Sequence, residues 1–406
     1  MSPHTILYID HCSELSGAQL SLLSLISGLD TSRFRPVVVL PADGPLASAL
    51  AERGIPVRLV PMASSFLALS RGFAAAHPFR TAAMLRHAFG PVREVRRIIR
   101  EERAAVVHSN SIKAHVLAAA ALRGTGARLI GHVRDILGRG PAERALLWAA
   151  RRWPDRVVAI SEAVRDSIVG PDADLDSVVT IHNGIDIEPV PSADDTDALR
   201  RELGVAPDVP LVGLVGQIAR WKGQHEFIEA AAAIAATHPE ARFLIVGKVM
   251  FPENEAQYER DLLALVEQLD LEKTILFTGE RRDVPRILAA CDVMVHAAIE
   301  PEPFGRVLVE AMAAAKPVVA TDTGASAEIV VGLNGPAAEP TGILVPPRDP
   351  DAIASAVVRL IGDRELARRL GAAGLERVRQ HFTIDRTIKA VEQLYSEVTS
   401  SSDEER

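Results

Sequence analysis

The chain has 406 residues, of which 48% are hydrophobic and 24% charged, and a net charge of −8. This length allows two globular domains of about 200 residues each. Its two cysteines, Cys12 and Cys291, form no disulfide framework and no metal-ligand spacing, which argues against a zinc site. No apolar run reaches the roughly 18 residues of a membrane-spanning helix and the N-terminus lacks a basic leader, so we expect a cytoplasmic protein.

The charge is unevenly distributed along the chain. Between Arg71 and Arg165, 18 Lys and Arg occur with 7 Asp and Glu, which gives +11 in this stretch and −19 in the rest. Such a stretch can simply be solvated, or it can contact anionic lipid headgroups at the inner face of a membrane, with segment 91–103 lying along the surface. Aromatic residues make up only 4% and no RNA-binding motif occurs, so nucleic acid is not an expected partner.

In the first half of the chain, short β-branched runs alternate with stretches rich in Ala, Leu and Arg. This alternation is typical of βαβ units. Strands are predicted at 6–9, 36–40, 57–60, 105–108, 128–132, 157–160 and 178–181. Helices are predicted between most of them, including 18–29 and 90–103.

A second series of elements follows an acidic segment, 191–200, which has no apolar periodicity and is interpreted as a linker. Its strands are predicted at 209–215, 241–246, 274–277, 293–296, 317–320 and 342–345, and a final helix at 385–398 is capped by Thr383. The sequence therefore predicts an α/β protein with two Rossmann-like, doubly wound parallel-sheet domains. Ligands of such sheets bind at the carboxyl ends of the strands, so two domains facing each other form a binding cleft.

The most informative segment is 300–331. An apolar stripe at helical spacing predicts a helix that begins near Gly305, and its members are Phe304, Val307, Leu308, Ala311, Met312 and Ala315. Glu310 falls on the opposite, polar side, where a solvated carboxylate is the alternative to a functional one. A helix that begins directly after the loop following a strand offers free backbone N–H groups and a partial positive charge to a diphosphate.

The run Glu302-Pro303-Phe304-Gly305, with a second carboxylate at Glu310, closely resembles family 4 of the retaining glycosyltransferases. Other motifs of that family occur in order along the chain: Gly17-Ala18-Gln19, Val157 to Ser161, Asn183-Gly184-Ile185-Asp186, Lys222-Gly223, and Gly279 followed by Asp283-Val284. The resemblance covers nearly the whole chain and implies the GT-B fold. It also implies transfer of a sugar from a nucleotide diphosphate with retained anomeric configuration and no demonstrated protein nucleophile.

The resemblance further implies which residues contact the donor. Glu302 and the backbone of Phe304 and Gly305 would hold hydroxyls of the sugar, and Glu310 would accept hydrogen bonds from the ribose, since a carboxylate offers several acceptor sites. Donor contacts are also expected at Gly17, Arg306 and Val307. At Gly17 a plain tight turn is the alternative.

No Asp-x-Asp occurs in a suitable loop, so we expect no metal and no cofactor, and cationic side chains must stabilise the leaving diphosphate. Arg220 and Lys222 are the candidates, with a solvated basic turn as the alternative. Many family members carry Arg directly after the glycine found here at 216, whereas this chain has Gln217. We expect Arg220 to share the role with Lys222.

His132 ends a predicted strand, and in the family a histidine at such a position faces the donor sugar; a structural histidine is the alternative. His108 and His115 lie seven residues apart, which fits no common metal-ligand pattern. The predicted domains are 1–190 on the acceptor side and 191–382 for the nucleotide sugar. Residues 383–406 would form a helix that returns to the first domain, followed by a polar tail.

The sequence thus predicts a metal-independent, retaining glycosyltransferase that acts on a glycan, lipid-linked or small-molecule acceptor. Two rival functions remain. A nucleotide-sugar 2-epimerase shares the fold, although the spaced carboxylates argue against it. A non-catalytic homologue that binds nucleotide sugars or glycans is the other, although Lys222, Glu302 and Glu310 are all present.

Overall fold

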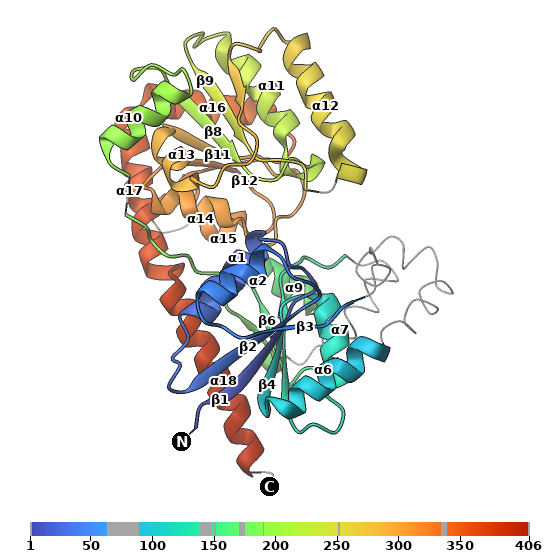
Figure 1. The fold of residues 1–406 in the computed structure, drawn as a ribbon. Coiled ribbons are helices and arrows are strands. Elements are labelled where there is room, and N and C mark those ends of the chain that lie inside the picture. The colour runs from blue at the N-terminus through green and yellow to red at the C-terminus, as the bar shows by residue number, and fades with distance from the viewer. Residues whose placement is uncertain are drawn as a thin grey trace. The chain divides into compact units, whose positions relative to one another are not determined.

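The structure, a computed structural model, describes residues 2–62, 89–138, 148, 152–169, 175–189, 191–250, 252–333 and 339–404. The chain forms two compact units, one of residues 1–184 with 384–406 (unit 1) and one of residues 185–383 (unit 2). Each unit is built on one parallel sheet with helices around it (Figure 1). The predicted fold class, two Rossmann-like α/β domains, is confirmed.

Unit 1 contains a seven-stranded sheet with the order β3-β2-β1-β4-β5-β6-β7. Its strands are β1 (His4–Ile9), β2 (Phe34–Leu40), β3 (Val57–Leu59), β4 (Ala104–Ser109), β5 (Arg128–Val133), β6 (Arg156–Ala159) and β7 (Val178–Thr180). All neighbouring strands are parallel, so their carboxyl ends lie at the same edge of the sheet. The seven strands predicted for this half are confirmed, with ends that differ by at most two residues.

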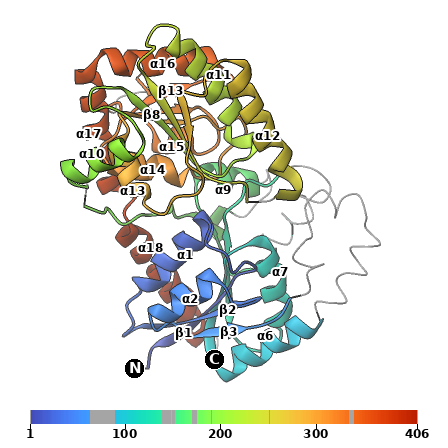
Figure 2. The same ribbon diagram turned by 45° about the horizontal axis from the view of Figure 1, so that its top comes forward.

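Helices cover both faces of this sheet (Figures 1 and 2). One face packs against α1 (Gly17–Ser27), α2 (Pro45–Glu52) and α18 (Ile384–Glu404), and the other against α6 (Phe89–Glu101) and α7 (Ile112–Ala121). Successive side chains of a strand point to opposite faces, so Tyr8 belongs to the first apolar layer and Leu7 to the second. A short helix, α9 (Glu162–Ile168), follows β6, and a 3₁₀ turn, η2 (Leu175–Ser177), precedes β7.

The C-terminal helix α18 completes the core of unit 1. Ile388, Val391, Leu394, Tyr395 and Val398 recur at helical spacing, are buried, and pack with the strands and with α1. The chain enters unit 2 at Ile185 and leaves it at Thr383, and these two residues form a parallel bridge. Residues nearly 200 positions apart in the sequence therefore lie side by side.

Unit 2 contains a six-stranded parallel sheet with the order β10-β9-β8-β11-β12-β13. Its strands are β8 (Leu211–Val215), β9 (Arg242–Val246), β10 (Ile275–Phe277), β11 (Val293–His296), β12 (Val318–Thr321) and β13 (Ile343–Val345). The surrounding helices are α10 (Ala193–Glu202), α11 (Gln224–Ala235), α12 (Pro252–Gln268), α13 (Val284–Ala290), α14 (Arg306–Ala313), α15 (Ser326–Ile329), α16 (Pro350–Gly362) and α17 (Arg364–His381). The six predicted strands are confirmed.

The interpretation of segment 191–200 as a linker is wrong, because α10 begins there. Ser192 caps the helix by accepting a hydrogen bond from the backbone N–H of Asp195, and acidic residues in the first turn and arginines in the last complement the helix dipole. The buried contacts are made by Leu199 and by Arg200, whose guanidinium donates to the carbonyl of Ala290 at 2.7 Å. With one apolar anchor and one buried arginine, α10 has no apolar stripe that a periodicity search could find.

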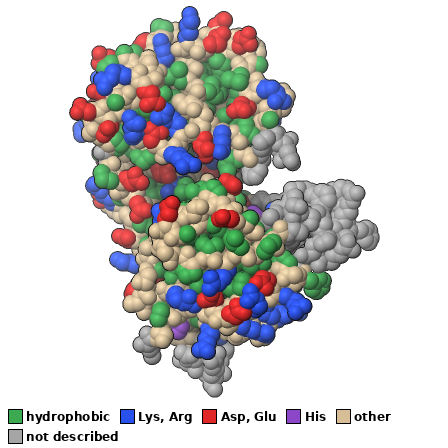
Figure 3. Space-filling view, in the orientation of Figure 1, with side chains coloured by type: hydrophobic (Ala, Val, Ile, Leu, Met, Phe, Trp, Pro, Cys, Tyr) green, Lys and Arg blue, Asp and Glu red, His purple; other side chains and the backbone are tan. Residues whose placement is uncertain are grey.

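The basic stretch 71–165 lies partly outside the described residues. In its described part, Val95, Ile98 and Ile99 of α6 are buried against the sheet, so these apolar side chains are not available to a membrane surface. Three of the four arginines of α6 are exposed, Arg96 donates to backbone carbonyls at the end of α7, and Lys and Arg side chains gather over this end of unit 1 (Figure 3). Among the described helices, none is long and apolar enough to cross a membrane.

Candidate active site

The turn after β8 is held tightly against the chain that follows β11. This turn contains the 3₁₀ helix η3 (Arg220–Lys222) and ends at Gly223, where α11 starts. Gly223 has a φ of 72°, and a Cβ atom there would lie 1.9 Å from the carbonyl oxygen of Ala297. Only glycine allows this approach. Because β8 and β11 are neighbours in the sheet, the turn reaches the loop that carries Glu302.

Lys222 and Glu302 form an ion pair across these two loops. Nζ of Lys222 lies 2.6 Å from Oε2 of Glu302, and the two side chains are only 17% and 10% exposed. The ammonium group also lies 4.1 Å from the ring centroid of Trp221, a cation–π distance. The backbone N–H of Ile299 donates to the carbonyl of Trp221 at 2.9 Å, which ties the loops together a second time. The structure thus joins two candidates 80 positions apart.

Glu302 is ionised and its backbone is fixed. Burial disfavours the charged form, but Lys222 and the imidazole of His296 outweigh burial and lower the pKa of the Glu302 carboxyl to about 2. Nε2 of His296 lies 3.4 Å from Oε2. Behind it, Gly324 has a φ of 57°, and a Cβ atom there would lie 2.3 Å from the Glu302 carbonyl oxygen, which also accepts the N–H of Ala325. Sequence reasoning did not identify His296 or Gly324.

The helix predicted near Gly305 is confirmed as α14, with Gly305 as its N-cap. Phe304 is buried and its ring packs edge-on against Phe382 at 6.1 Å. A Cβ atom on Gly305 would lie 3.7 Å from the Glu302 side chain, so the start of α14 adjoins the ion pair. Since a glycine cap offers no side-chain acceptor, the first N–H groups of α14 have no side-chain cap and remain suited to an anion.

Glu310 is neither buried in the core nor simply solvated. Its Oε1 accepts a hydrogen bond from Nε of Arg306 at 2.7 Å, one turn earlier on α14, and both side chains are about a quarter exposed. Val307, between them in sequence, is half-buried, whereas Val309 is fully buried although it lies outside the predicted apolar stripe. The carboxylate is therefore oriented by Arg306 on the accessible side of the helix.

Arg220 has different partners from Lys222. Its guanidinium lies 3.0 Å from the Asp261 carboxylate on α12 and 4.9 Å from the ring centroid of Tyr258, and its side chain is 59% exposed. A role at a phosphate would require Arg220 to leave Asp261. The carbonyl oxygen of Gln217 accepts a hydrogen bond from the Gln224 side chain at 2.7 Å, which fixes the backbone at that position.

His132 and Gly17 belong to unit 1. His132 lies near the carboxyl end of β5, is buried, and its Nδ1 lies 3.0 Å from Nε2 of His108. Burial, and then the charge of Arg134, lower the pKa of His132 well below its usual value. Gly17 is the first residue of α1, and a Cβ atom there would meet no heavy atom within 4 Å, so packing in the described structure does not require glycine at this position.

A second polar network at the carboxyl edge of unit 1 was missed in part by sequence reasoning. The Asn110 amide donates to Asp10 at 2.6 Å, and Arg134 donates to Asn110 and to Asn183 at 2.6 and 2.8 Å. Asp10 also accepts the Gln19 amide at 3.1 Å. Asn183 and Gln19 stand in motifs of the family resemblance, but Asp10, Asn110 and Arg134 do not. The available signal was position, because each lies one or two residues after the end of a predicted strand.

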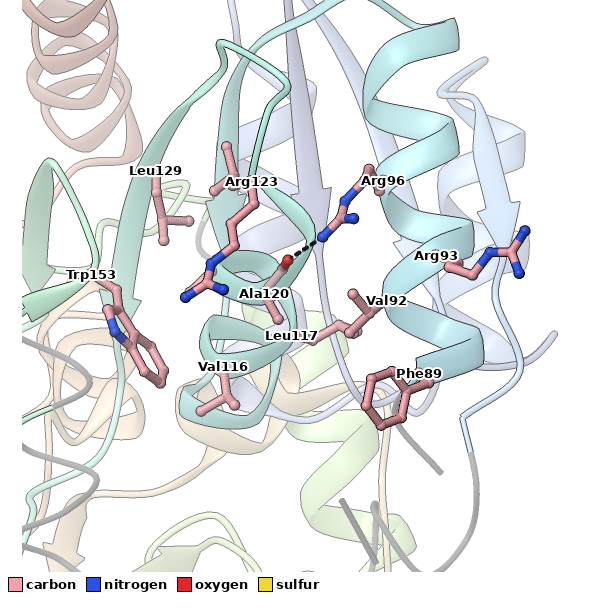
Figure 4. Close-up of a pocket in the computed structure, with 12 residues that line it drawn as sticks. Phe89, Val92, Arg93, Arg96, Val116, Leu117, Ala120, Arg123, Leu129 and Trp153 are labelled. Atoms are coloured by element: carbon pink, nitrogen blue, oxygen red, sulfur yellow. Dashed lines mark hydrogen bonds between the residues drawn. The ribbon is translucent and has the colours of Figure 1, made fainter. Parts of the chain in front are cut away.

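A pocket of about 580 Å³ lies elsewhere in unit 1, between α6 and α7 (Figure 4). Apolar side chains and arginines line it, among them Phe89, Val92, Arg93, Arg123 and Trp153. None of the candidate site residues is among its described lining residues, so the pocket is separate from them. Within the described residues, no group of three His, Cys, Asp or Glu is placed to hold a metal ion.

Two family models match the chain. The model described as Glycosyltransferase Family 4 matches residues 16–189, and the model described as Glycosyl transferases group 1 matches residues 195–377. The matches fall in units 1 and 2 respectively, apart from residues 185–189 at the start of unit 2. The chain belongs to family 4 of the glycosyltransferases and has the GT-B fold.

Curated relatives include the lipopolysaccharide core biosynthesis mannosyltransferase LpsB of Rhizobium meliloti (strain 1021), 32% identical over 223 residues, which are 55% of this chain and 61% of that protein. N-acetyl-alpha-D-glucosaminyl L-malate synthase of Bacillus anthracis is 28% identical over 266 residues, 65% of each chain. These matches span less than two thirds of either relative. The crystal structure of Anabaena Alr3699/HepE in complex with UDP and glucose has 28% identity and a TM-score of 0.81, covering 96% of this chain and 99% of that one.

Proposed function

We propose that this protein is a retaining, metal-independent glycosyltransferase that moves a sugar from a nucleotide diphosphate to a hydroxyl acceptor. The observation that carries the proposal is the Lys222–Glu302 pair beside the start of α14. A cation, a carboxylate and the N-terminal end of a helix lie together there, and these are the groups that a sugar diphosphate needs.

In this proposal, donor binding replaces the contacts of the ion pair one after the other, first at Lys222 and then at Glu302. A diphosphate that approaches the start of α14 competes with Glu302 for the ammonium group of Lys222. As Lys222 turns toward the phosphate, oxygens of Glu302 become available as acceptors for hydroxyls of the sugar. The pKa of about 2 supports this role, because Glu302 stays charged at neutral pH and cannot act there as a proton donor.

The proposal assigns the ribose to Glu310. Arg306 already holds one oxygen of this carboxylate, which orients it and leaves acceptor capacity for a hydroxyl pair. Backbone groups of Phe304, Gly305 and Val307, and the open turn at Gly17, would complete the donor contacts. Arg220 would join Lys222 at the leaving phosphate in place of a metal ion.

The proposed reaction breaks the bond between the anomeric carbon and the diphosphate oxygen and forms one from the same face to the acceptor oxygen. The departing phosphate accepts the acceptor's proton, so no side chain has to form a covalent intermediate. The family resemblance supports this stereochemistry. The acceptor, whether glycan, lipid-linked or small molecule, is assigned to unit 1.

A uridine diphosphate sugar is the first donor to test, because the similar Anabaena structures were solved with UDP and with UDP-glucose. Thermal shift with UDP-, GDP- and ADP-glucose should show one selective rise in melting temperature, since a ligand that binds only the folded state stabilises it. Product from the stabilising donor, with retained configuration by NMR and activity in EDTA, would support the proposal. An epimer formed from donor alone would indicate an epimerase, and binding without turnover a non-catalytic homologue.

A further inference from the structure

Four buried side chains in unit 1 form one hydrogen-bonded row. The hydroxyl oxygens of Tyr8 and Tyr395 lie 2.7 Å apart, the Tyr395 hydroxyl lies 2.6 Å from Nδ1 of His108, and Nε2 of His108 lies 3.0 Å from Nδ1 of His132. All four side chains are at most 2% exposed. Nε2 of His132, at the end of the row, has no hydrogen-bond partner among the described residues.

The row runs from the middle of the sheet to its carboxyl edge. Tyr8 of β1 and His108 of β4 are register partners, and Ile130 of β5 is the partner of His108 on its other side. His132 lies two residues beyond Ile130, so it is on the same face and nearer the carboxyl ends. Parallel sheets bind their ligands at that edge. The fourth member, Tyr395, comes from the C-terminal helix α18.

Both histidines in this row are neutral. Burial, and then the nearby charge of Arg134, lower the pKa of His108 to about 3 and that of His132 well below its usual value. Burial also raises the pKa values of Tyr8 and Tyr395, so both hydroxyls keep their protons. Two hydroxyls and two neutral imidazoles carry four protons, of which three are used by the three hydrogen bonds. One proton must remain at one end of the row.

The surroundings of the two ends decide where that proton lies. If every hydrogen bond ran toward Tyr8, its hydroxyl would keep the spare proton, but Tyr8 is fully buried and has no other hydrogen-bond partner among the described residues. A buried donor without an acceptor is unfavourable at either end, but Tyr8 lies within the sheet, whereas Nε2 of His132 lies near the carboxyl edge, where a ligand can supply the acceptor. The opposite direction leaves the spare proton on Nε2 of His132. It also makes the phenol of Tyr395 the donor to an imidazole nitrogen, which is the better acceptor.

We propose that Tyr8, Tyr395 and His108 fix His132 as an Nε2–H donor to an oxygen atom of the sugar substrate, so that Tyr395 of the C-terminal helix is a positioning residue of the active site. The proposal rests on the proposed function. A neutral N–H donor suits a hydroxyl or ring oxygen, which carries no charge. Residues at the far end of the sequence thereby orient a group in the N-terminal sheet.

The tautomer is measured directly by long-range ¹H–¹⁵N NMR of the ¹⁵N-histidine-labelled protein at pH 7, with the His132 signals assigned through His132→Asn. The expected result is a protonated Nε2 and an unprotonated Nδ1 at His132. An Nδ1–H tautomer, or an imidazolium, would overturn the proposal. This measurement needs no substrate, so it tests the row even if no sugar transfer is found.

Activity is tested with Tyr395→Phe, which removes the hydroxyl and keeps the ring. We expect His132 to become a mixture of tautomers and turnover to fall about five- to tenfold with little change in donor KM, the effect of one lost hydrogen bond. Phe34→Leu is the matched control, because Phe34 packs edge-on against Tyr395 at 5.5 Å without entering the row. It should lower the melting temperature but leave the His132 signals and turnover unchanged.

A second pair of variants separates orientation from packing. The amide of a glutamine can donate to His132 as Nε2 of His108 does, so His108→Gln should retain more turnover than His108→Leu, with an Nε2–H tautomer at His132. Equal activity of these two variants, or wild-type signals and turnover in Tyr395→Phe, would show that the row serves folding alone. If the wild-type protein transfers no sugar, that result would instead count against the proposed function.

Discussion

The two units place polar groups at the carboxyl edges of their sheets by different means. Unit 2 uses pairs of opposite charge, Lys222 with Glu302 and Arg306 with Glu310, which retain some exposure. In unit 1, Asn110 links the charged groups of Asp10 and Arg134 through hydrogen bonds. The same unit also contains a fully buried neutral row that ends at His132. A charged pair can exchange its partner for a charged ligand, whereas a neutral buried row only fixes the direction of a donor. The contrast suits a charged group, such as a diphosphate, at the edge of the unit 2 sheet and an uncharged oxygen at the edge of the unit 1 sheet.

The strongest test of this contrast is Lys222→Met. Removing the cation leaves the leaving diphosphate without its main partner, and we expect turnover to fall about 10²- to 10³-fold. The melting temperature should also fall, because Glu302 would remain as a buried, uncompensated charge. Lys248→Met is the control, since Lys248 makes an ion pair of the same length with Glu280 in which both side chains are about half exposed. Equal effects of both substitutions would remove the special role of Lys222.

Arg220→Ala should lower turnover by about 10²-fold if Arg220 joins Lys222 at the phosphate. The melting temperature should change little, because the pair with Asp261 is exposed and such pairs contribute about 0 to 1 kcal/mol. Gln217→Ala should have a much smaller effect on turnover. Near-normal turnover of Arg220→Ala, together with an inactive Gln217→Ala, would reverse the assignment and leave Arg220 as a partner of α12.

Glu310→Gln should keep the fold and weaken nucleotide binding by about 1.5 to 3 kcal/mol, the contribution of charge-assisted hydrogen bonds. Calorimetry with the nucleoside diphosphate alone measures this without the sugar. Glu365→Gln is a suitable control because Glu365 forms a helical pair with Arg368 that is 72% exposed on both sides. Unchanged affinity of Glu310→Gln would return Glu310 to the role of a solvated partner of Arg306.

The pH dependence of stability should differ between the units. The pKa of His108 is lower in the folded state than its ordinary value of 6.5. Below pH 6.5 the unfolded chain therefore binds a proton at this histidine that the folded chain does not bind. The free energy of unfolding falls as a result when the pH drops from 6.5 toward 3. Each such histidine contributes about 1.4 kcal/mol per pH unit. The pKa of Glu302 falls from 4.5 to about 2, so unit 2 loses its contribution only below pH 4.5.

Urea unfolding between pH 7.5 and 5.5 tests this, with the fluorescence of Trp148 and Trp153 reporting unit 1 in a Trp221→Phe background. His108→Gln should reduce the fall in unfolding free energy between pH 7.5 and 5.5 by about 1.4 kcal/mol, because the unfolded histidine takes up nearly one proton over this range. The same slope in both proteins would mean that His108 is charged or exposed in the folded state, and would remove the neutral row on which the contrast depends.

The smallest expected effect concerns membrane association through unit 1. Phe89 is 72% exposed at the start of α6, and Arg93 and Arg123 line the neighbouring pocket. We expect sedimentation with anionic vesicles at low salt and release at high salt, with Arg93→Ala and Arg123→Ala each weakening binding by about 1 kcal/mol. Arg368→Ala in unit 2 should have no effect. Recovery in the supernatant at both salt concentrations would exclude the association.

The sequence by itself determined the elements and their order. Short apolar, β-branched runs predicted all thirteen described strands, and the apolar stripe with Gly305 located the start of α14, because these signals depend on neighbours within about one helical turn. It failed at α10, where a buried arginine replaces the apolar stripe. The candidate residues could be found from motifs that follow strands, since parallel sheets place such positions at one edge.

Only the tertiary structure decided which side chains meet. Lys222 reaches Glu302 across 80 positions because Gly223 lies against Ala297, and Tyr395 reaches His108 across 287 positions because α18 packs beside β4. A pairing of this kind depends on strand order, register and the close approach of loops, none of which leaves a periodic trace in the sequence. The charge of Glu302 and the tautomer of His132 depend on those pairings, and so they too were decided by the fold.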